Sequence, residues 1–460
     1  MICKGVSSVM YKLTHEKHQP KYIGQDMMEF LANAKFEDLP AEVVTRAKHV
    51  VMDDIAVTLA GRKTRVMFDI TWDHMAPAGD VTPVGCNFKT TAAMAAFLNA
   101  LHAQTHDYND GLNNSGMLGG AYHPGRTVVS TALAVGQKVH ASGKDILLAV
   151  VLGIEAAARM RNPSHDSTVA DIYSSAVVAA KLMGADAEQM RSACTLAAHI
   201  SVGLKSKSMG YVRPATDGKA AGATANVMKY AYLNRNGVEA AEFAMMGYEG
   251  PGLNDNNAIA SRYYTCGLGK EFQCMDMYFK PWPCCRKTHG AIAAALALRD
   301  EHGVKAEDIE AIRVFQQTTG MYVNTPITSE MDINFGGQFS LQYTVSCVFL
   351  DGTVDLRHYR WADRKAPQQY VDLAAKVTVI ADNGLDGHNA ISPNHGIVEV
   401  DLKDGRTLSM YCQYPLGSEP NGMTEEQRIA KLRYCADEMT EEQKDTLVNW
   451  ILKLDEVASL

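Results

Sequence analysis

The sequence predicts a mainly α protein, built from a large helical domain, an α+β insert and a helical C-terminal return. Alanine-rich segments with apolar residues at three- and four-residue steps dominate the chain up to about residue 250. Segments with the two-residue alternation of β-strands follow, and helix-capping patterns return near the C-terminus. With 460 residues the chain is long enough for two domains. We expect a helical domain over 1–275, an α+β domain over 276–412 and C-terminal helices over 413–460 that return to the helical domain.

The first half of the chain predicts a series of packed helices. Apolar residues recur at helical steps from 39 to 60, and Gly61 is expected to end this helix. Alanines over 91–103 predict a second, closely packed helix. Pro124 can occupy the first turn of a helix to about residue 140, which places His123 at an N-terminus that favours anions. Further helices are expected over 145–160, 168–184, 187–204, 218–233 and 237–247, the first of them apolar nearly all round and therefore buried.

The character of the chain changes at 279–285, Phe-Lys-Pro-Trp-Pro-Cys-Cys. A helix is expected over 287–302, and the alternation over 309–316 predicts a strand with Ile312 and Val314 on one face. Further strands are expected over 376–380, 396–402 and 407–412, the last two joined by the hairpin signal Lys-Asp-Gly-Arg. Thr424-Glu-Glu-Gln427 and Thr440-Glu-Glu-Gln443 are capping boxes that predict two C-terminal helices.

Composition and charge exclude several classes of partner. The formal net charge is −8 without a long basic run, which argues against nucleic acid and anionic membranes. An anionic substrate stays compatible, because a pocket can be locally cationic. The ten cysteines have no framework spacing and are expected to be reduced thiols. No signal-peptide pattern and no apolar stretch of about 18 residues is present, so we expect a cytoplasmic protein without a membrane partner.

The most informative segment is the glycine-rich loop over 103–125, which brings Asp107, Asn109, Asp110 and His123 close together in the chain. A flexible backbone with acids and an imidazole is typical of a cavity for small polar substrates. With His102 and His106 the same loop could ligate a metal, but no recurrent ligand spacing supports one. A polar loop with helix-capping aspartates is the plain structural alternative.

Two other clusters have plain structural alternatives. Cys284, Cys285 and His289 suggest zinc or a thiol nucleophile, but adjacent cysteines chelate a tetrahedral metal poorly and no base is visible. The basic residues between Lys205 and Lys219, Arg213 among them, form either a solvated surface or a wall that binds carboxylates. No nucleotide-binding glycine pattern occurs, so no cofactor is expected.

Several short segments form one ordered pattern from about residue 25 to about residue 412. They are Glu37-Asp-Leu-Pro-Ala-Glu-Val-Val, Ala56-Val-Thr-Leu-Ala-Gly61, Ala95-Ala-Phe-Leu-Asn-Ala, His106-Asp-Tyr-Asn-Asp110, His123-Pro, Gly153-Ile-Glu155, Asn236-Gly-Val-Glu-Ala-Ala, Lys280-Pro-Trp-Pro-Cys-Cys with His289, Tyr322-Val-Asn-Thr-Pro and Phe339-Ser-Leu-Gln-Tyr343. As a whole, this pattern resembles the MmgE/PrpD family, which includes 2-methylcitrate dehydratases, cis-aconitate decarboxylases and an iminodisuccinate epimerase. The resemblance implies a helical domain with an α+β lid, usually as a homodimer, with an active site between the two domains and no cofactor.

The resemblance also implies site residues, by comparison with the cis-aconitate decarboxylases. Asp107 falls at the acidic position of the catalytic loop, and His123 matches the histidine before proline. His165 matches a histidine upstream of a Ser/Ala-rich helix. Lys280 matches the lysine at the lid junction, and Tyr322 matches the tyrosine of the Tyr-Val-Asn stretch.

Two positions depart from the decarboxylase pattern. Gly111 stands where the decarboxylases have a threonine, and Arg213 stands where they have a lysine before proline. Arg213 is nevertheless suited to bind a substrate carboxylate in bidentate fashion.

Three functions are compatible with these residues. The first is a cofactor-independent lyase, a dehydratase or decarboxylase, acting on a small di- or tricarboxylate of the 2-methylcitrate, citrate or cis-aconitate type. The second is an isomerase or epimerase of a dicarboxylate such as iminodisuccinate, since all these reactions stabilise negative charge beside a carboxylate while a proton moves. The third is a non-catalytic carboxylate binder.

Overall fold

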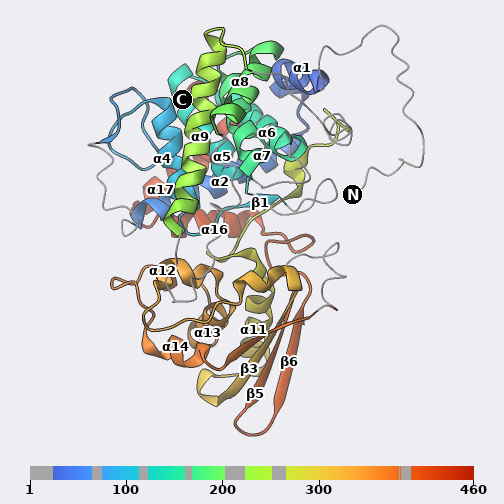
Figure 1. Cartoon of the computed structure of the whole chain (residues 1–460), viewed down its shortest axis with the longest axis vertical. Helices are drawn as coiled ribbons and strands as arrows, with labels where there is room; N and C mark the ends of the chain where they lie inside the picture. The colour runs from blue at the N-terminus through green and yellow to red at the C-terminus, as the bar shows by residue number, and fades with distance from the viewer. Residues whose placement is uncertain are drawn as a thin grey trace, which may run out of the picture.

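The computed structural model describes residues 24–64, 75–112, 123–160, 168–201, 223–250, 266–382, 384 and 395–460. These residues form a helical domain and a smaller α+β domain, which is called the lid below (Figure 1). The molecule is mainly α with a smaller α+β domain, so the predicted fold class is confirmed.

The helical domain is built around helices that are buried on almost every side. Every residue of α4 is buried, and α6 is buried except at Lys144 and Asp145, as its apolar sequence predicts. Helix α9 packs along α4, α7 and α8, and α6 packs along α7. The helices are α1 (Gln25–Asn33), α2 (Ala41–Lys63), α4 (Ala92–Gln104), α5 (Gly125–Val139), α6 (Gly143–Arg159), α7 (Thr168–Leu182), α8 (Ala187–Ile200) and α9 (Ala223–Met245).

Two glycines explain where the predicted helix ends are wrong. Helix α2 continues through Gly61 to Lys63, although the sequence predicts an end at Gly61. A Cβ on Gly61 would lie 1.9 Å from the His102 carbonyl oxygen, so this glycine allows α2 and α4 to approach each other. Helix α9 likewise continues through Gly237, where the sequence predicts two helices, and a Cβ there would lie 2.3 Å from Oγ of Ser175 in α7. Both glycines mark close helix contacts.

The lid contains a four-stranded sheet in the order β4-β3-β5-β6. Strand β3 (Ile309–Gln316) pairs in parallel with β4 (Val377–Ala381) and antiparallel with β5 (Gly396–Leu402). Strand β5 forms the predicted hairpin with β6 (Thr407–Cys412). The predicted strands are therefore present, to within a residue at their ends.

Helices cover the sheet and build the core of the lid. Helix α11 (His289–His302) packs on β5 and β6 (Figure 1). Ile312 and Val314 of β3 are fully buried in this core, as the alternation predicts. Three further helices, which the apolar periodicity does not predict, are α12 (Ile333–Gly336), α13 (Leu341–Asp351) and α14 (Gln368–Ala374).

The C-terminal helices α16 (Glu425–Cys435) and α17 (Glu441–Leu452) pack against α2 of the helical domain. Both begin with the predicted capping boxes, in which Thr424 and Thr440 accept hydrogen bonds from the backbone three residues on. In Figure 1, α16 lies at the boundary between the two domains. Helix α16 is thereby placed beside the segment that joins the helical domain to the lid, where Lys431 donates to the Lys280 carbonyl oxygen.

Backbone contacts tie the two domains together. Strand β1 (Gly111–Leu112) of the helical domain pairs with β2 (Met277–Tyr278), directly before the lid. The Tyr108 hydroxyl donates to the Pro281 carbonyl oxygen at 3.1 Å, and the side-chain amide of Gln338 donates to the Thr105 carbonyl oxygen at 3.3 Å. All three contacts involve residues 105–112, so this described part of the glycine-rich segment lies along the domain boundary.

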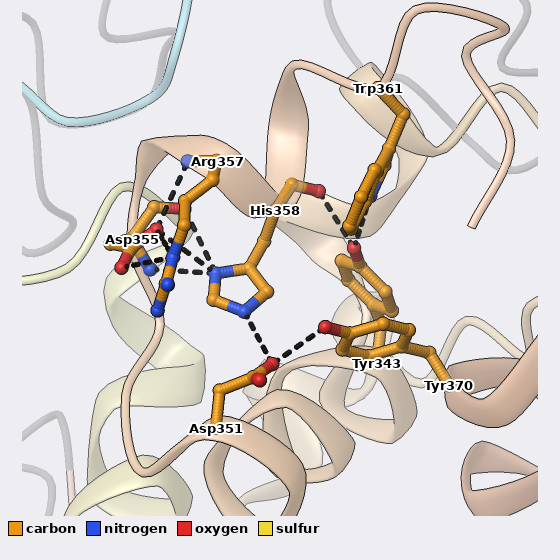
Figure 2. A network of polar contacts seen from close by, with 7 residues as sticks. All are labelled: Tyr343, Asp351, Asp355, Arg357, His358, Trp361 and Tyr370. Carbon is orange, nitrogen blue, oxygen red and sulfur yellow. Dashed lines mark hydrogen bonds and ion pairs between the residues drawn. The ribbon is translucent and has the colours of Figure 1, made fainter. Parts of the chain in front are cut away.

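A polar network around a buried histidine stabilises the lid (Figure 2). His358 is buried between two carboxylates, with Nε2 3.0 Å from Asp351 and Nδ1 3.3 Å from Asp355. The Tyr370 hydroxyl donates to the same Asp351 oxygen at 2.6 Å, and the Tyr343 hydroxyl donates to the His358 carbonyl oxygen at 2.7 Å. The network joins α13, α14 and the short helix η10 (Leu356–Tyr359), which is a structural role.

The sequence also predicts that no helix spans a membrane and that the cysteines are reduced. No helix among the described residues is long and apolar enough to cross a membrane. Cys266 is disulfide-bonded, so the expectation that every cysteine is reduced is wrong at this residue. The free cysteines among the described residues are Cys86, Cys194, Cys274, Cys284, Cys285, Cys347, Cys412 and Cys435.

Candidate active site

A buried ion pair lies at the domain boundary. Nζ of Lys280 is 3.1 Å from Oδ2 of Asp107 and donates to the Asp107 carbonyl oxygen at 2.5 Å. Lys280 is 1% exposed, and burial alone would lower its pKa. The Asp107 carboxylate outweighs burial, so the pKa of Lys280 is raised and the ammonium stays charged. Two residues that are 173 positions apart thus form one charged unit.

The backbone at Asp107 is held in an uncommon conformation. Asp107 follows the C-terminal turn of α4 with a φ of +45°, in the left-handed region that side chains other than glycine rarely adopt. Aspartate tolerates this region better than most residues. This conformation and the two contacts with Lys280 fix the carboxylate at the domain boundary, and strain of this kind is typical of functional sites.

His123 lies next to this pair, at the start of α5. Its Nδ1 makes a short hydrogen bond with the Asp110 carbonyl oxygen. Because a carbonyl only accepts, Nδ1 carries the proton and Nε2 is the ring nitrogen that can take up another. Burial lowers the pKa of His123 well below 6.5, and the charges of Lys280 and Arg126 lower it further. The imidazole is therefore neutral at neutral pH.

Asp110 occupies the helix end that the sequence assigns to an anion. Its Oδ1 accepts a hydrogen bond from the Gly125 backbone N–H at 3.1 Å, at the first residue of α5. A Cβ on Gly125 would lie 2.1 Å from the other carboxyl oxygen, which explains the glycine. Burial and the nearby Asp53 raise the pKa of Asp110 to about 8. The start of α5 is thus satisfied by the protein itself, and Asp110 positions His123.

Arg286 and Tyr278 are the next two residues of the site. Together with Asp107, Asp110, His123 and Lys280 they are called the cluster below. The Arg286 guanidinium carbon lies 4.9 Å from the centre of the Tyr278 ring. Both residues are buried, and neither Nη1 of Arg286 nor the Tyr278 hydroxyl has a hydrogen-bond partner among the described residues. The Arg286 charge lowers the pKa of both His123 and His289, which places it within electrostatic reach of them. Neither residue is predicted as a site residue from the sequence, although Arg286 directly follows the Pro-Trp-Pro-Cys-Cys segment.

Tyr278 also explains one of the two departures. In the β1–β2 pair, Gly111 is directly opposite Tyr278. A Cβ at residue 111 would lie 2.3 Å from the Tyr278 hydroxyl oxygen and equally close to the ring. The phenol therefore fills the space that a side chain at residue 111 would need.

Tyr322 reaches the same cluster from the lid. It lies on the short helix η8 (Thr318–Val323), and its hydroxyl is 3.3 Å from Sγ of Cys285. The residue is 46% exposed, yet its hydroxyl contacts a buried thiol. Burial of the hydroxyl and the neighbouring Cys285 raise its pKa well above 10, and the Asp107 charge adds to this shift. The phenol consequently keeps its proton across the physiological range.

Not every predicted site residue falls in this cluster. His165, Arg213 and the basic cluster between Lys205 and Lys219 lie outside the described residues. His106 is turned towards α2, where Nε2 lies 2.5 Å from Oγ1 of Thr64. Among the described residues, no group of three or more His, Cys, Asp or Glu side chains is arranged to hold a metal ion.

The segment 277–280 separates the cluster from a pocket on the surface. Met277 and Phe279 line that pocket together with Arg46 and His49. Tyr278 and Lys280, which alternate with them, contact the cluster instead. This alternation is the ordinary geometry of extended backbone, and it directs both functional side chains to the same side.

Lys431, on the C-terminal helix α16, contacts the backbone next to the ion pair. Its Nζ lies 2.6 Å from Oδ1 of Asp53 and donates to the carbonyl oxygens of Tyr108 and Lys280 at 2.9 and 3.0 Å. It thereby fixes the backbone on both sides of the ion pair. Sequence reasoning misses this residue, because its partners lie more than 150 residues away.

Comparison with known proteins covers almost the whole chain. Residues 25–254 match the MmgE/PrpD N-terminal domain, and residues 282–454 match the MmgE/PrpD C-terminal domain. A cis-aconitate decarboxylase of Aspergillus terreus is 23% identical over 98% of this chain and 97% of its own length. A cis-aconitate decarboxylase of Mus musculus is 23% identical over 95% of this chain and 91% of its own length. The two matches together span both structural domains, and the chain belongs to the MmgE/PrpD family.

Proposed function

We propose that this chain is a cofactor-independent lyase that removes water or carbon dioxide from a small di- or tricarboxylate of the 2-methylcitrate, citrate or cis-aconitate type. The observation that carries the proposal is the buried Asp107–Lys280 pair with the neutral His123 beside it. Family membership and the decarboxylase activity in the names of the relatives support a lyase.

The ion pair suits the charge that such a reaction develops. Loss of water or carbon dioxide next to a carboxylate builds up negative charge on the substrate. Lys280 is a fixed cation in a buried site, where an electrostatic contact is stronger than in water. Asp107 holds the ammonium group in position and keeps it protonated. The ammonium group of Lys280 can therefore stabilise the developing anion without reorganising.

Proton transfer has a separate base and acid. His123 is neutral with Nε2 as its basic atom, so it is suited to remove a proton. Tyr322 keeps its proton and is suited to return one from the lid. Environments that push two titratable groups in opposite directions are typical of acid–base pairs. We further propose His165 as a proton-transfer residue, Arg213 as a carboxylate-binding residue and a homodimeric, cytoplasmic enzyme.

One observation favours an isomerase or epimerase as a second candidate. The base, His123, comes from the helical domain, whereas the acid, Tyr322, comes from the lid. Groups supplied by different domains could act on opposite faces of one carbon atom. Removal of a proton from one face and its return to the other inverts that carbon, as in an epimerisation of iminodisuccinate.

Incubation of the full chain with cis-aconitate, citrate, 2-methylcitrate and iminodisuccinate in heavy water tests the proposal, with proton NMR as the readout. A lyase converts one of the acids to a product that lacks water or carbon dioxide. Incorporation of solvent deuterium into otherwise unchanged iminodisuccinate would favour the epimerase instead. Binding of an acid without any change in its spectrum would leave only the carboxylate binder.

Three substitutions test the assignment of the residues. Asp107→Asn, His123→Ala and Lys280→Ala are each expected to lower kcat/KM by at least about 100-fold, the range seen for general acid–base and electrostatic groups. Lys305→Ala and His302→Ala change exposed residues of the same types and serve as matched controls. Wild-type kcat/KM in all three site variants would contradict the assignment of Asp107, His123 and Lys280 to the active site.

A further inference from the structure

Arg286 is a buried cation that has no counter-ion among the described residues. Its side chain is 8% exposed, and Nη1 has no hydrogen-bond partner among the described residues. No acidic side chain of the described residues forms an ion pair with it, whereas the nearby Lys280 is paired with Asp107. A buried guanidinium without a partner is unfavourable, because it loses hydration without compensation. The site is therefore poised to receive an anion.

Tyr278 offers a second donor at the same place. Its ring lies beneath the Arg286 guanidinium, with 4.9 Å between the guanidinium carbon and the ring centre. The hydroxyl is buried without a partner among the described residues. Burial raises the pKa of Tyr278 and so keeps its proton available for donation. Nη1 of Arg286 and the hydroxyl of Tyr278 are thus two neighbouring donors without acceptors.

The charges around these donors select a monovalent anion. Lys280 and Asp107 cancel each other, and burial keeps His123 and His289 neutral by lowering the pKa of each well below 6.5. Of these five described groups, Arg286 is the one that adds a net positive charge. A carboxylate balances it with a single negative charge, whereas a phosphate dianion would bring excess charge close to Asp107. Two oxygen atoms of a carboxylate also match two separate donors.

We propose that Arg286 and Tyr278 bind a carboxylate of the substrate that does not itself react. The proposal rests on the proposed function and defines its substrate class further, as acids with an additional carboxylate beyond the one at the reacting carbon. Position 111 belongs to this site, because Gly111 leaves the space that Tyr278 occupies. The phenol then supplies a hydroxyl where the decarboxylase pattern has that of a threonine.

Calorimetric titration of the full chain with tricarballylate, a tricarboxylate that cannot react, tests the proposal. Arg286→Met is expected to weaken binding about 10- to 100-fold, and Tyr278→Phe about 3- to 10-fold, in line with hydrogen bonds to a charged group. Arg286→Lys keeps the charge, loses the planar fork and is expected to lie between wild type and Arg286→Met. Arg299→Met changes a half-buried arginine of α11 that is paired with Asp300, and this variant is expected to bind as wild type does.

Truncated acids show whether the effect belongs to one carboxylate. Glutarate lacks the central carboxylate of tricarballylate, and methylsuccinate lacks a terminal one. Wild type is expected to bind one of the two at least about 10-fold more weakly than tricarballylate, and Arg286→Met is expected to lose this preference. With a substrate that turns over, Arg286→Met is expected to raise KM much more than it lowers kcat.

The possible failures are distinguishable. Equal affinity of wild type and Arg286→Met for tricarballylate, or no binding to wild type, overturns the proposal. If wild type binds tricarballylate and Arg286→Met does not, but no acid is ever converted, the lyase fails and the binding site stands. If Arg286→Met does not give a cooperative thermal transition, then Tyr278→Phe, which removes a single oxygen atom, decides: unchanged affinity of that variant contradicts the proposal.

Discussion

Lys280 is a buried ammonium group whose charge depends on one carboxylate. Burial favours its neutral form, and the Asp107 carboxylate 3.1 Å away reverses that preference. His123, which is held by Asp110, has the opposite behaviour, because burial and three nearby cations keep it neutral. The charged state of Lys280 and the neutral state of His123 are therefore each set by identified neighbouring groups.

The state of His123 predicts the pH dependence of catalysis. A base must be unprotonated, and the pKa of His123 is lowered well below 6.5 by burial, Lys280 and Arg126. We expect kcat/KM to stay constant as the pH falls through 6.5 and to decline only well below it. A pH–rate profile of the full chain checks this expectation. An acidic limb centred at or above pH 6.5 that disappears in His123→Gln would contradict it.

Residue types and spacing could predict only part of this site. Asp107 and His123 stand out in a glycine-rich loop, whereas Lys280 and Tyr322 are identified only through the family resemblance. Arg286 and Tyr278 could not be found, since what distinguishes them is the lack of a partner after folding. The sequence shows which residues carry a charge, but it does not show which groups lie beside them after folding.

At the scale of elements, helix α2 and helix α4 meet at Gly61, and this contact predicts a stability change. Alanine in a helix interior ordinarily stabilises relative to glycine by about 0.5–1 kcal/mol. Because a Cβ at residue 61 would lie 1.9 Å from a backbone oxygen, we expect Gly61→Ala to destabilise instead, by about 1–3 kcal/mol. Urea unfolding measures the change. A more stable Gly61→Ala would contradict the packing.

The His358 network of the lid predicts a pH optimum of stability. Burial opposes the charge of His358, but hydrogen bonds with Asp355 and Asp351 raise its pKa above 6.5. The pKa values of Asp351 and Asp355 are lowered below 3.8, since hydrogen bonds from Tyr370 and His358 to Asp351 and from His358 to Asp355 outweigh the opposite effect of burial. The stabilisation from the histidine is complete below pH 6.5 and is lost as the pH rises through its raised pKa. The stabilisation from the carboxylates is complete above pH 3.8 and is lost as the pH falls through theirs.

The network should therefore stabilise the lid most between pH 3.8 and pH 6.5. The difference in unfolding free energy between wild type and His358→Gln, measured by urea unfolding from pH 3 to pH 9, is expected to be largest in this window. His302→Gln, at an exposed position of α11, is the matched control. A difference that grows steadily above pH 7 is incompatible with this account.

Periodicity predicts most elements well because it reports which face is buried. Strand β3 is placed correctly for this reason, whereas both capping boxes are placed correctly because their hydrogen bonds join residues only three positions apart. Periodicity fails at Gly61 and Gly237, because a glycine that ends a helix and a glycine that admits a neighbouring helix look alike in one sequence. Only the neighbouring element distinguishes them.

At the scale of the whole molecule, the C-terminal helices complete a site whose other parts come from distant segments. Lys431 bonds to Asp53 and to the carbonyl oxygens on both sides of the ion pair. Lys431→Met leaves Asp53 buried without its cation, and breaking a buried pair in this way costs about 3–5 kcal/mol. We expect a loss of that size in urea unfolding and a reduced kcat. Lys365→Met, at an exposed pair, is the control; wild-type stability and kcat in Lys431→Met would contradict this role.

The pairing of Gly111 with Tyr278 also limits how the family can diversify at this site. The volume of a phenol ring occupies the place of any larger residue at position 111. A lineage that acquires a branched residue there must first replace the tyrosine with something smaller, so the two substitutions can only be accepted in one order. We expect the two positions to covary among relatives, with a bulky residue at one always accompanied by a compact residue at the other.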